Sequence, residues 1–240
     1  ALATDPATLK QIYDSSLIVL YRLLFILYAE ARELLPLRES AAYRDEYSLE
    51  AIKREIVRRK AGGTPLLPTT ARLWAKLRDL FQIIDQGSPP LHVATFNGGL
   101  FDGKKHQFLE RHTVGDARLL EAIDKLARVG GEFVDYRDLA ERHLGTIYEG
   151  LLEYHLQPIA PAGGWTIDLF NQNGERHRTG SYYTPDFVVQ YIVDQTLRPI
   201  LDAAVAGKTS DDAKIAAVLA VNVLDPAMGS GHFPVAAMEY

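Results

Sequence analysis

The chain has 240 residues, and 47% of them are hydrophobic, which is enough for one large domain or two modest ones with a real core. It contains no cysteine, which excludes a disulfide framework and a thiolate zinc site. The chain has 26 basic and 31 acidic residues and a net charge of −5, so any surface that binds nucleic acid has to be local.

The first predicted element is a long helix over residues 6–34, which Pro36 ends because proline cannot continue a helix. The most apolar part of this helix, Leu17–Ala29, is shorter than the roughly 20 apolar residues that span a bilayer. It also lacks the basic flank and the small-residue cleavage site of a signal peptide. We therefore expect a buried helix of a cytoplasmic protein without a membrane segment, with Glu30 and Glu33 on its solvated face.

Four more helices are predicted from apolar periodicity in the first two thirds of the chain, over residues 48–60, 70–85, 116–128 and 135–156. The first of these four has a basic C-terminal half, formed by Lys53, Arg54, Arg58, Arg59 and Lys60. Cations suit a helix C-terminus, so a solvated face is one explanation and a phosphate contact is the other.

A hairpin-like region follows the helices. Residues 157–161 and 165–170 are predicted strands, and the glycine pairs and Asn-Gly steps around them predict turns. A short basic loop, 176–178, comes next. Its side chains suit either a DNA phosphate contact or bulk solvent. We expect a domain boundary within 155–175.

Another amphipathic helix begins after Gly180-Ser181-Tyr182-Tyr183-Thr184-Pro185. Threonine is a good N-cap and proline is welcome at the first helical position, so Thr184 and Pro185 predict the start of the helix. One apolar face then recurs at helical spacing, formed by Val188, Val189, Ile192, Val193, Leu197, Ile200 and Leu201.

The last predicted unit is a strand, a loop and a helix. The apolar run Leu219–Leu224 predicts a buried strand, Asp225 and two glycines predict a loop, and residues 233–238 predict the start of a helix. Such a turn opens a doubly wound sheet, where nucleotide-like ligands bind at the carboxyl ends of the strands. A Gly-rich turn without any ligand is the simpler explanation.

The loop does not fit three other Gly-rich sites. A phosphate-binding P-loop requires Lys and then Ser or Thr after its last glycine, but His232 and Phe233 follow here. A dinucleotide fingerprint requires G-x-G-x-x-G, of which Gly229-Ser230-Gly231 supplies only the first half. A nucleophile elbow requires glycines two residues away from the serine on each side, and here they are adjacent to it.

Two motifs together resemble a known family. Asp225-Pro226-Ala227-Met228-Gly229-Ser230-Gly231-His232-Phe233 resembles the signature D-P-A/P-x-G-S/T-G-x-F/L of S-adenosyl-L-methionine-dependent amino-methyltransferases that act on DNA. Gly180–Pro185, about forty residues upstream, looks like motif X of the γ-class adenine methylases, which precedes this motif I. The resemblance implies that the cofactor is contacted by Tyr183, Thr184, Pro185, Asp225, Pro226, Ala227, Gly229, Ser230 and Gly231.

The resemblance extends over nearly the whole chain. The segments 21–30, 97–101 and 144–152 look like helical motifs of type IIG restriction–modification methylases and of the adenine methylases of BREX-type phage defence. In that family the first part is a helical connector between a nuclease and the methylase. The implied organisation is a mainly α helical connector or spacer domain, a hairpin-like linker, and the start of an α/β Rossmann-like methyltransferase domain, over residues 1–155, 156–180 and 181–240.

The catalytic tetrapeptide of the family, N/D/S-P-P-Y/F, holds and stacks the flipped adenine, and it is absent from this chain. We therefore expect the catalytic motif beyond Tyr240, no metal ion, and no activity from this segment alone. The parent protein would methylate adenine N6 in double-stranded DNA, with a nuclease in cis or with other defence proteins as partners. The alternatives are a helical DNA-recognition or protein-interaction module with a non-catalytic methylase remnant, or a methylase that acts on RNA or protein.

Overall fold

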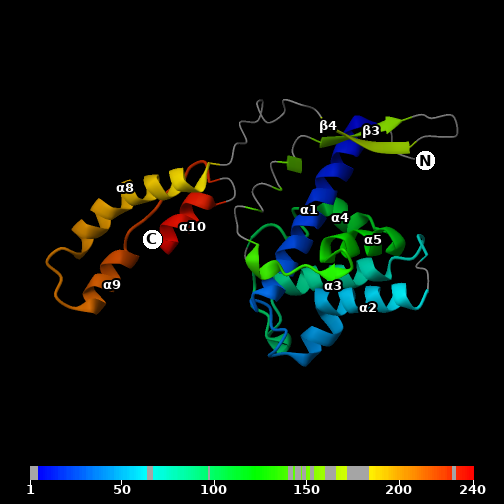
Figure 1. Ribbon diagram of the computed structural model, residues 1–240, viewed down its shortest axis with the longest axis horizontal. Helices are drawn as coiled ribbons and strands as arrows, with labels where there is room; N and C mark the ends of the chain where they lie inside the picture. The colour runs from blue at the N-terminus through cyan, green and yellow to red at the C-terminus, as the bar shows by residue number, and fades with distance from the viewer. Residues whose placement is uncertain are drawn as a thin grey trace. The chain divides into compact units, whose positions relative to one another are not determined.

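The computed structural model is mostly helical, and the residues that it describes form two small two-stranded sheets (Figure 1). It describes residues 5–63, 67–96, 98–139, 143, 147, 150–151, 154–159, 166–171, 184–228 and 231–240. The chain divides into two compact units, which are residues 1–139 with 156–168, and residues 140–155 with 169–240. The predicted helical character of the first part is confirmed.

Unit 1 is built around the long helix α1, Pro6–Ala31. The Asp5 side chain caps α1 by accepting a hydrogen bond from the Thr8 amide at 2.9 Å. Contrary to the expectation from its most apolar run, α1 is long and apolar enough to cross a bilayer. A core helix passes the same test, and much of one face of α1 is buried in unit 1.

The first predicted helix, over residues 6–34, ends three residues early, at Ala31. Three further predicted helices of unit 1 are confirmed to within two residues at each end, as α2 (Leu49–Ala61), α3 (Arg72–Gln86) and α5 (Asp116–Ala127). Their apolar faces and that of α1 share one core, which contains Leu23, Ile26, Leu35, Tyr43, Leu49, Ile52, Ile56, Leu73, Trp74, Leu77, Leu80, Phe81, Ile84, Leu119 and Ile123. Shorter elements connect these helices. They are the π-helix η1 (Tyr43–Tyr47), the 3-10 turn η2 (Pro89–Leu91) and α4 (Gln107–Arg111).

The predicted helix over 135–156 is wrong at both of its ends, whereas residues 143, 147, 150 and 151 within it are helical. Strands β1 (Arg128–Val129) and β2 (Glu132–Phe133) form a small antiparallel pair, and only the 3-10 turn η3 (Tyr136–Asp138) follows them directly. Asp135 caps this short turn, so the cap was predicted correctly but its helix was not.

The predicted hairpin-like region is confirmed as two strands that pair with each other. They are β3 (Tyr154–Ile159) and β4 (Thr166–Asn171). The basic loop 176–178 lies outside the described residues, and so do most residues of the segment 144–152.

Unit 2 contains α8 (Asp186–Val205), α9 (Asp211–Leu219) and α10 (His232–Glu239), and α8 packs against the other two. Its small core contains Val189, Val193, Leu197 and Ala236, three of which belong to the predicted apolar face. The predicted start of α8 is wrong by one residue. Pro185 occupies the N-cap and no side chain caps the helix, so Thr184 lies outside it.

The predicted buried strand Leu219–Leu224 is also wrong. Leu219 ends α9, and residues 221–224 have no regular secondary structure. A buried strand requires neighbouring strands that satisfy its backbone groups, and no described strand pairs with this run. Its apolar side chains are exposed instead, at 79% for Leu219 and 86% for Leu224.

Candidate functional site

The starts of α8 and α10 lie together in unit 2. At one end, His232 Nε2 is 3.2 Å from Asp186 Oδ1. At the other end, the Tyr240 hydroxyl donates to Asp194 Oδ1 at 2.7 Å. Both contacts join residues 46 positions apart in the sequence, so the two helices run parallel and in register (Figure 1). Their N-termini therefore point in the same direction.

The two predicted cofactor segments directly precede these helix starts. Thr184 and Pro185 lead into α8, and Gly231 leads into α10. The structure therefore brings together parts of two motifs that are about forty residues apart in the sequence. Tyr183, Gly229 and Ser230 lie outside the described residues.

The loop before α10 is organised by its own residues. Asp225 Oδ1 accepts a hydrogen bond from the Ala227 amide at 2.9 Å, and Pro226 lies in the turn between them. Asp225 and Thr184 are half-buried, whereas Pro185, Pro226 and Ala227 are exposed. Asp225 Oδ2 makes no hydrogen bond to the described residues, so it is free to accept one from a ligand.

Gly231 is the residue that requires glycine for its backbone conformation. Its φ of +85° lies in the left-handed region, which side chains with a Cβ disfavour, and its amide donates to the Met228 carbonyl at 2.8 Å. A Cβ at Gly231 would meet nothing within 4 Å, so the backbone angle and not lack of space favours glycine here.

Neither of the two adjacent helix starts has a side-chain cap. The first amides of a helix have no partner within the helix, and they give the N-terminus a partial positive charge. Two parallel helix starts can therefore offer backbone donors to the anionic end of a ligand. Asp186, the first residue of α8, lies beside them and contacts His232. Among the described residues, no group of three His, Asp or Glu side chains could hold a metal ion.

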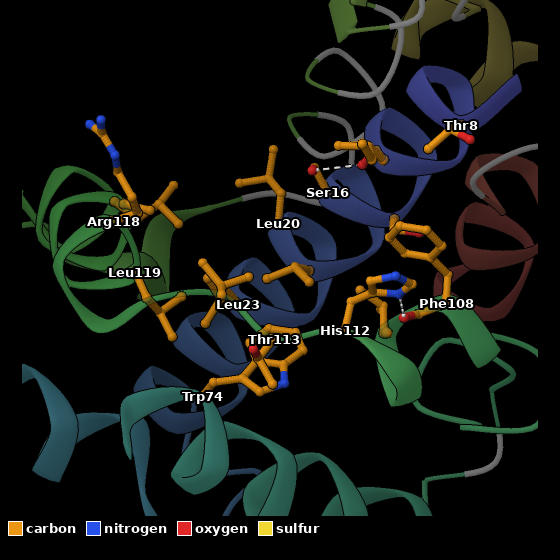
Figure 2. Close-up of a pocket in the computed structure, with 17 residues that line it drawn as sticks. Thr8, Ser16, Leu20, Leu23, Trp74, Phe108, His112, Thr113, Arg118 and Leu119 are labelled. Atoms are coloured by element: carbon orange, nitrogen blue, oxygen red, sulfur yellow. Dashed lines mark hydrogen bonds between the residues drawn. The ribbon is translucent and has the colours of Figure 1, made fainter. Parts of the chain in front are cut away.

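A separate cavity of about 530 Å³ lies in unit 1 between α1, α4 and α5 (Figure 2). Its walls are mainly apolar, with Leu20, Leu23 and Leu119 among them and Trp74 at its base (Figure 2). Of the residues that the sequence assigned to the cofactor, none that the structure describes lines this cavity.

The motifs at 21–30 and 97–101 meet in the core of unit 1. Arg22 Nε donates to the Leu100 carbonyl at 2.8 Å. Its guanidinium carbon lies 4.8 Å from the ring centre of Phe81 and 5.6 Å from that of Phe101. Phe25 packs edge-on against Phe101, at 5.4 Å between ring centres. These contacts show that both motifs belong to the packed core of unit 1. The sequence signal for this role was the charged residue Arg22 inside an apolar run.

The expectation that Glu30 lies on a solvated face is wrong. Its side chain is buried, and it accepts hydrogen bonds from the Tyr43 hydroxyl at 2.9 Å and from the amides of Leu49 and Glu50 at 2.8 and 2.9 Å. Glu30 therefore caps the start of α2 from another helix. Burial raises the pKa of Glu30 to about 7, although the hydrogen bonds oppose that rise. Glu33 is half exposed, as expected, and pairs with Arg38.

Most of the basic side chains of α2 have acidic partners within unit 1. Lys53 and Arg54 pair with Glu50, Arg59 pairs with Glu55, and Lys60 pairs with Asp124. A phosphate would have to compete with these carboxylates. The structure therefore favours a solvated, internally paired face over a phosphate site on α2.

Comparison with family models, with curated proteins and with solved structures gives no match for this chain.

Proposed function

We propose that the chain is part of a DNA adenine-N6 methyltransferase of a restriction–modification or phage-defence system, and that unit 2 binds S-adenosyl-L-methionine at the starts of α8 and α10. The observation that carries this proposal is the parallel register of these helices, which brings the end of the Y-T-P segment beside the end of the D-P-A-M-G-S-G segment. A coincidental match of two short patterns gives no reason for them to meet in space.

The residues present suit this cofactor. The uncapped helix starts offer amides to its carboxylate, and the free Asp225 Oδ2 can accept a hydrogen bond from its ammonium group. Gly231 lets the backbone turn sharply beside the ligand. When bound, the cofactor supplies an electrophilic sulfonium methyl group. The role of this chain is to bind and orient that group for attack by the adenine nitrogen.

In this proposal, unit 2 is the start of a Rossmann-like methyltransferase domain. The exposed side chains of Leu219 and Leu224 support this assignment, because apolar side chains of this size are normally covered by neighbouring elements. The adenine-binding tetrapeptide is absent from the chain, so the segment supplies the cofactor side of the site only. Double-stranded DNA is the proposed substrate, a nuclease in cis or other defence proteins are the proposed partners, and the cytoplasm is the proposed location.

The test is transfer of labelled methyl from S-adenosyl-L-methionine to unmethylated duplex DNA by the full-length gene product. We expect label in adenine, and we expect its loss in Asp225→Ala. Asp211→Ala is the matched control, because Asp211 is an exposed acid of the same unit on α9. Equal methyl transfer by the wild type, Asp225→Ala and Asp211→Ala would show that Asp225 does not belong to the cofactor site.

The cavity in unit 1 favours a second candidate, a helical interaction module whose methylase part is a remnant. An apolar, preformed hollow of about 530 Å³ is within the size range of sites that bind apolar groups. The same assay separates the two candidates. A folded full-length protein that labels no DNA would favour the module, whereas label in adenine would exclude it.

A further inference from the structure

We infer that His232 and Asp186 form a positioning pair that holds the two cofactor segments of the proposed site in register, an inference that rests on the proposed function. Asp186 is the first residue of α8 and directly follows Pro185. His232 is the first residue of α10 and directly follows Gly231. Their contact is therefore a side-chain link between the ends of the two motifs.

The position of this contact couples the histidine side chain to the loop before α10. His232 Nε2 lies 3.2 Å from Asp186 Oδ1, and the histidine side chain is only 14% exposed. In the tautomer with its hydrogen on Nε2, the imidazole donates to the carboxylate. The neighbouring Gly231 is tied to Met228 by its amide and to Val235 by its carbonyl. A shift of the imidazole would therefore move the glycine turn and the first turn of α10 together.

The chain contains a matched control at the other end of the same helix pair. The Tyr240 hydroxyl donates to Asp194 on α8, across the same spacing of 46 residues. Arg198 also pairs with Asp194. This second link joins α8 to α10 as the first one does, but none of the proposed cofactor residues that the structure describes directly precedes either of its ends. A purely structural role predicts similar effects from losing either link, whereas a positioning role predicts different effects on the cofactor.

The experiment measures binding of S-adenosylhomocysteine to the full-length gene product by calorimetry. The variants are His232→Ala, Asp186→Ala, the double variant, Asp186→Asn and Tyr240→Phe. We expect each alanine variant to weaken binding by about tenfold, since small misplacements of positioning groups have effects of this order or larger. The double variant should lose no more than either single variant, because the two residues act as one unit.

Two variants distinguish a positioning role of the pair from a general loss of folding stability. Asp186→Asn retains an oxygen that accepts from the imidazole, so it should bind with nearly the wild-type affinity. Tyr240→Phe should also keep that affinity, even where its unfolding midpoint falls. Far-UV circular dichroism checks each fold, and His232→Asn replaces His232→Ala where the alanine variant does not fold.

Unchanged affinity in both single alanine variants would overturn the inference. It would also be overturned if the double variant lost as much affinity as the two single losses multiplied together, or if Tyr240→Phe lost as much affinity as the alanine variants. If methyl transfer by the wild type persists in those cases, the proposed function stands without this pair. A wild-type protein that neither binds S-adenosylhomocysteine nor transfers methyl refutes the proposed function, and the inference is overturned with it.

Discussion

Replacing Glu30 with alanine should destabilise unit 1 strongly, although the sequence predicts a solvated position for Glu30 near the end of its helix. The substitution removes the acceptor for the Tyr43 hydroxyl and for the Leu49 amide, and both residues are fully buried. Each buried donor left without a partner costs about 1–3 kcal/mol. The Glu50 amide is near the surface and can bond water instead. We expect a loss of about 2–5 kcal/mol in the free energy of unfolding.

The control is Glu33→Ala, three residues further along the chain. Its ion pair with Arg38 is largely exposed, so its loss should cost less than about 1 kcal/mol. The assay is urea unfolding followed by tryptophan fluorescence in a Trp165→Phe background, where Trp74 in the core of unit 1 is the remaining reporter. Equal midpoints for Glu30→Ala and Glu33→Ala would refute the argument that burial makes the difference.

The pH dependence of stability gives an independent test of the buried carboxyl group. The pKa of Glu30 is about 7 in the folded protein against a model value of 4.5, so the folded state binds the proton more tightly. The stability that this group contributes is therefore fully present below about pH 4.5 and is lost as the pH rises to about 7, by roughly 3 kcal/mol. Glu30→Gln cannot titrate, so it should gain stability relative to the wild type across that window. A constant difference between the two proteins would show that Glu30 does not titrate in this range.

Three further predictions concern the packing and the loop. Arg22→Ala should cost about 2–4 kcal/mol in urea unfolding, because the bond to Leu100 and the packing on two aromatic rings are lost. Asp116→Ala should cost a similar 2–4 kcal/mol, because this fully buried carboxylate joins the start of α5 to the start of α3. Gly231→Ala should destabilise unit 2 by about 1 kcal/mol through its positive φ and also weaken S-adenosylhomocysteine binding. Gly207→Ala has the same backbone penalty and equal space, and it should leave that binding unchanged.

The proposed cofactor site is supported by two kinds of observation. The motif patterns come from the sequence, and their meeting in space comes from the register of α8 and α10. The methyl-transfer assay tests the identity of the cofactor and of the substrate. Three of the nine assigned residues, Tyr183, Gly229 and Ser230, lie outside the part of the chain that the structure describes.

Local patterns in the sequence were sufficient to locate the principal helices of unit 1. Apolar spacing of three and four residues marks the buried face of α3, and Ser48 marks the start of α2 by accepting from the Ala51 amide. These signals act over one or two turns, so they can be read without knowing the fold. The hairpin strands β3 and β4 were found in the same way, with errors only at their ends.

Contacts between residues far apart in the sequence depend on the folded structure. The sequence predicted a solvated position for Glu30, but in the folded structure the start of α2 packs against its side chain. Similarly, the contact of Arg22 with Leu100 joins residues that are 78 positions apart. The run Leu219–Leu224 has the composition of a buried strand, but a strand forms only where neighbours accept and donate its backbone hydrogen bonds. Local patterns located the principal helices to within a few residues, and the motifs that lie beside their starts. The packing of α8 on α10 brings the end of the Y-T-P segment beside the end of the D-P-A-M-G-S-G segment. The register of the two helices depends on contacts between distant residues, which a local sequence pattern does not reveal.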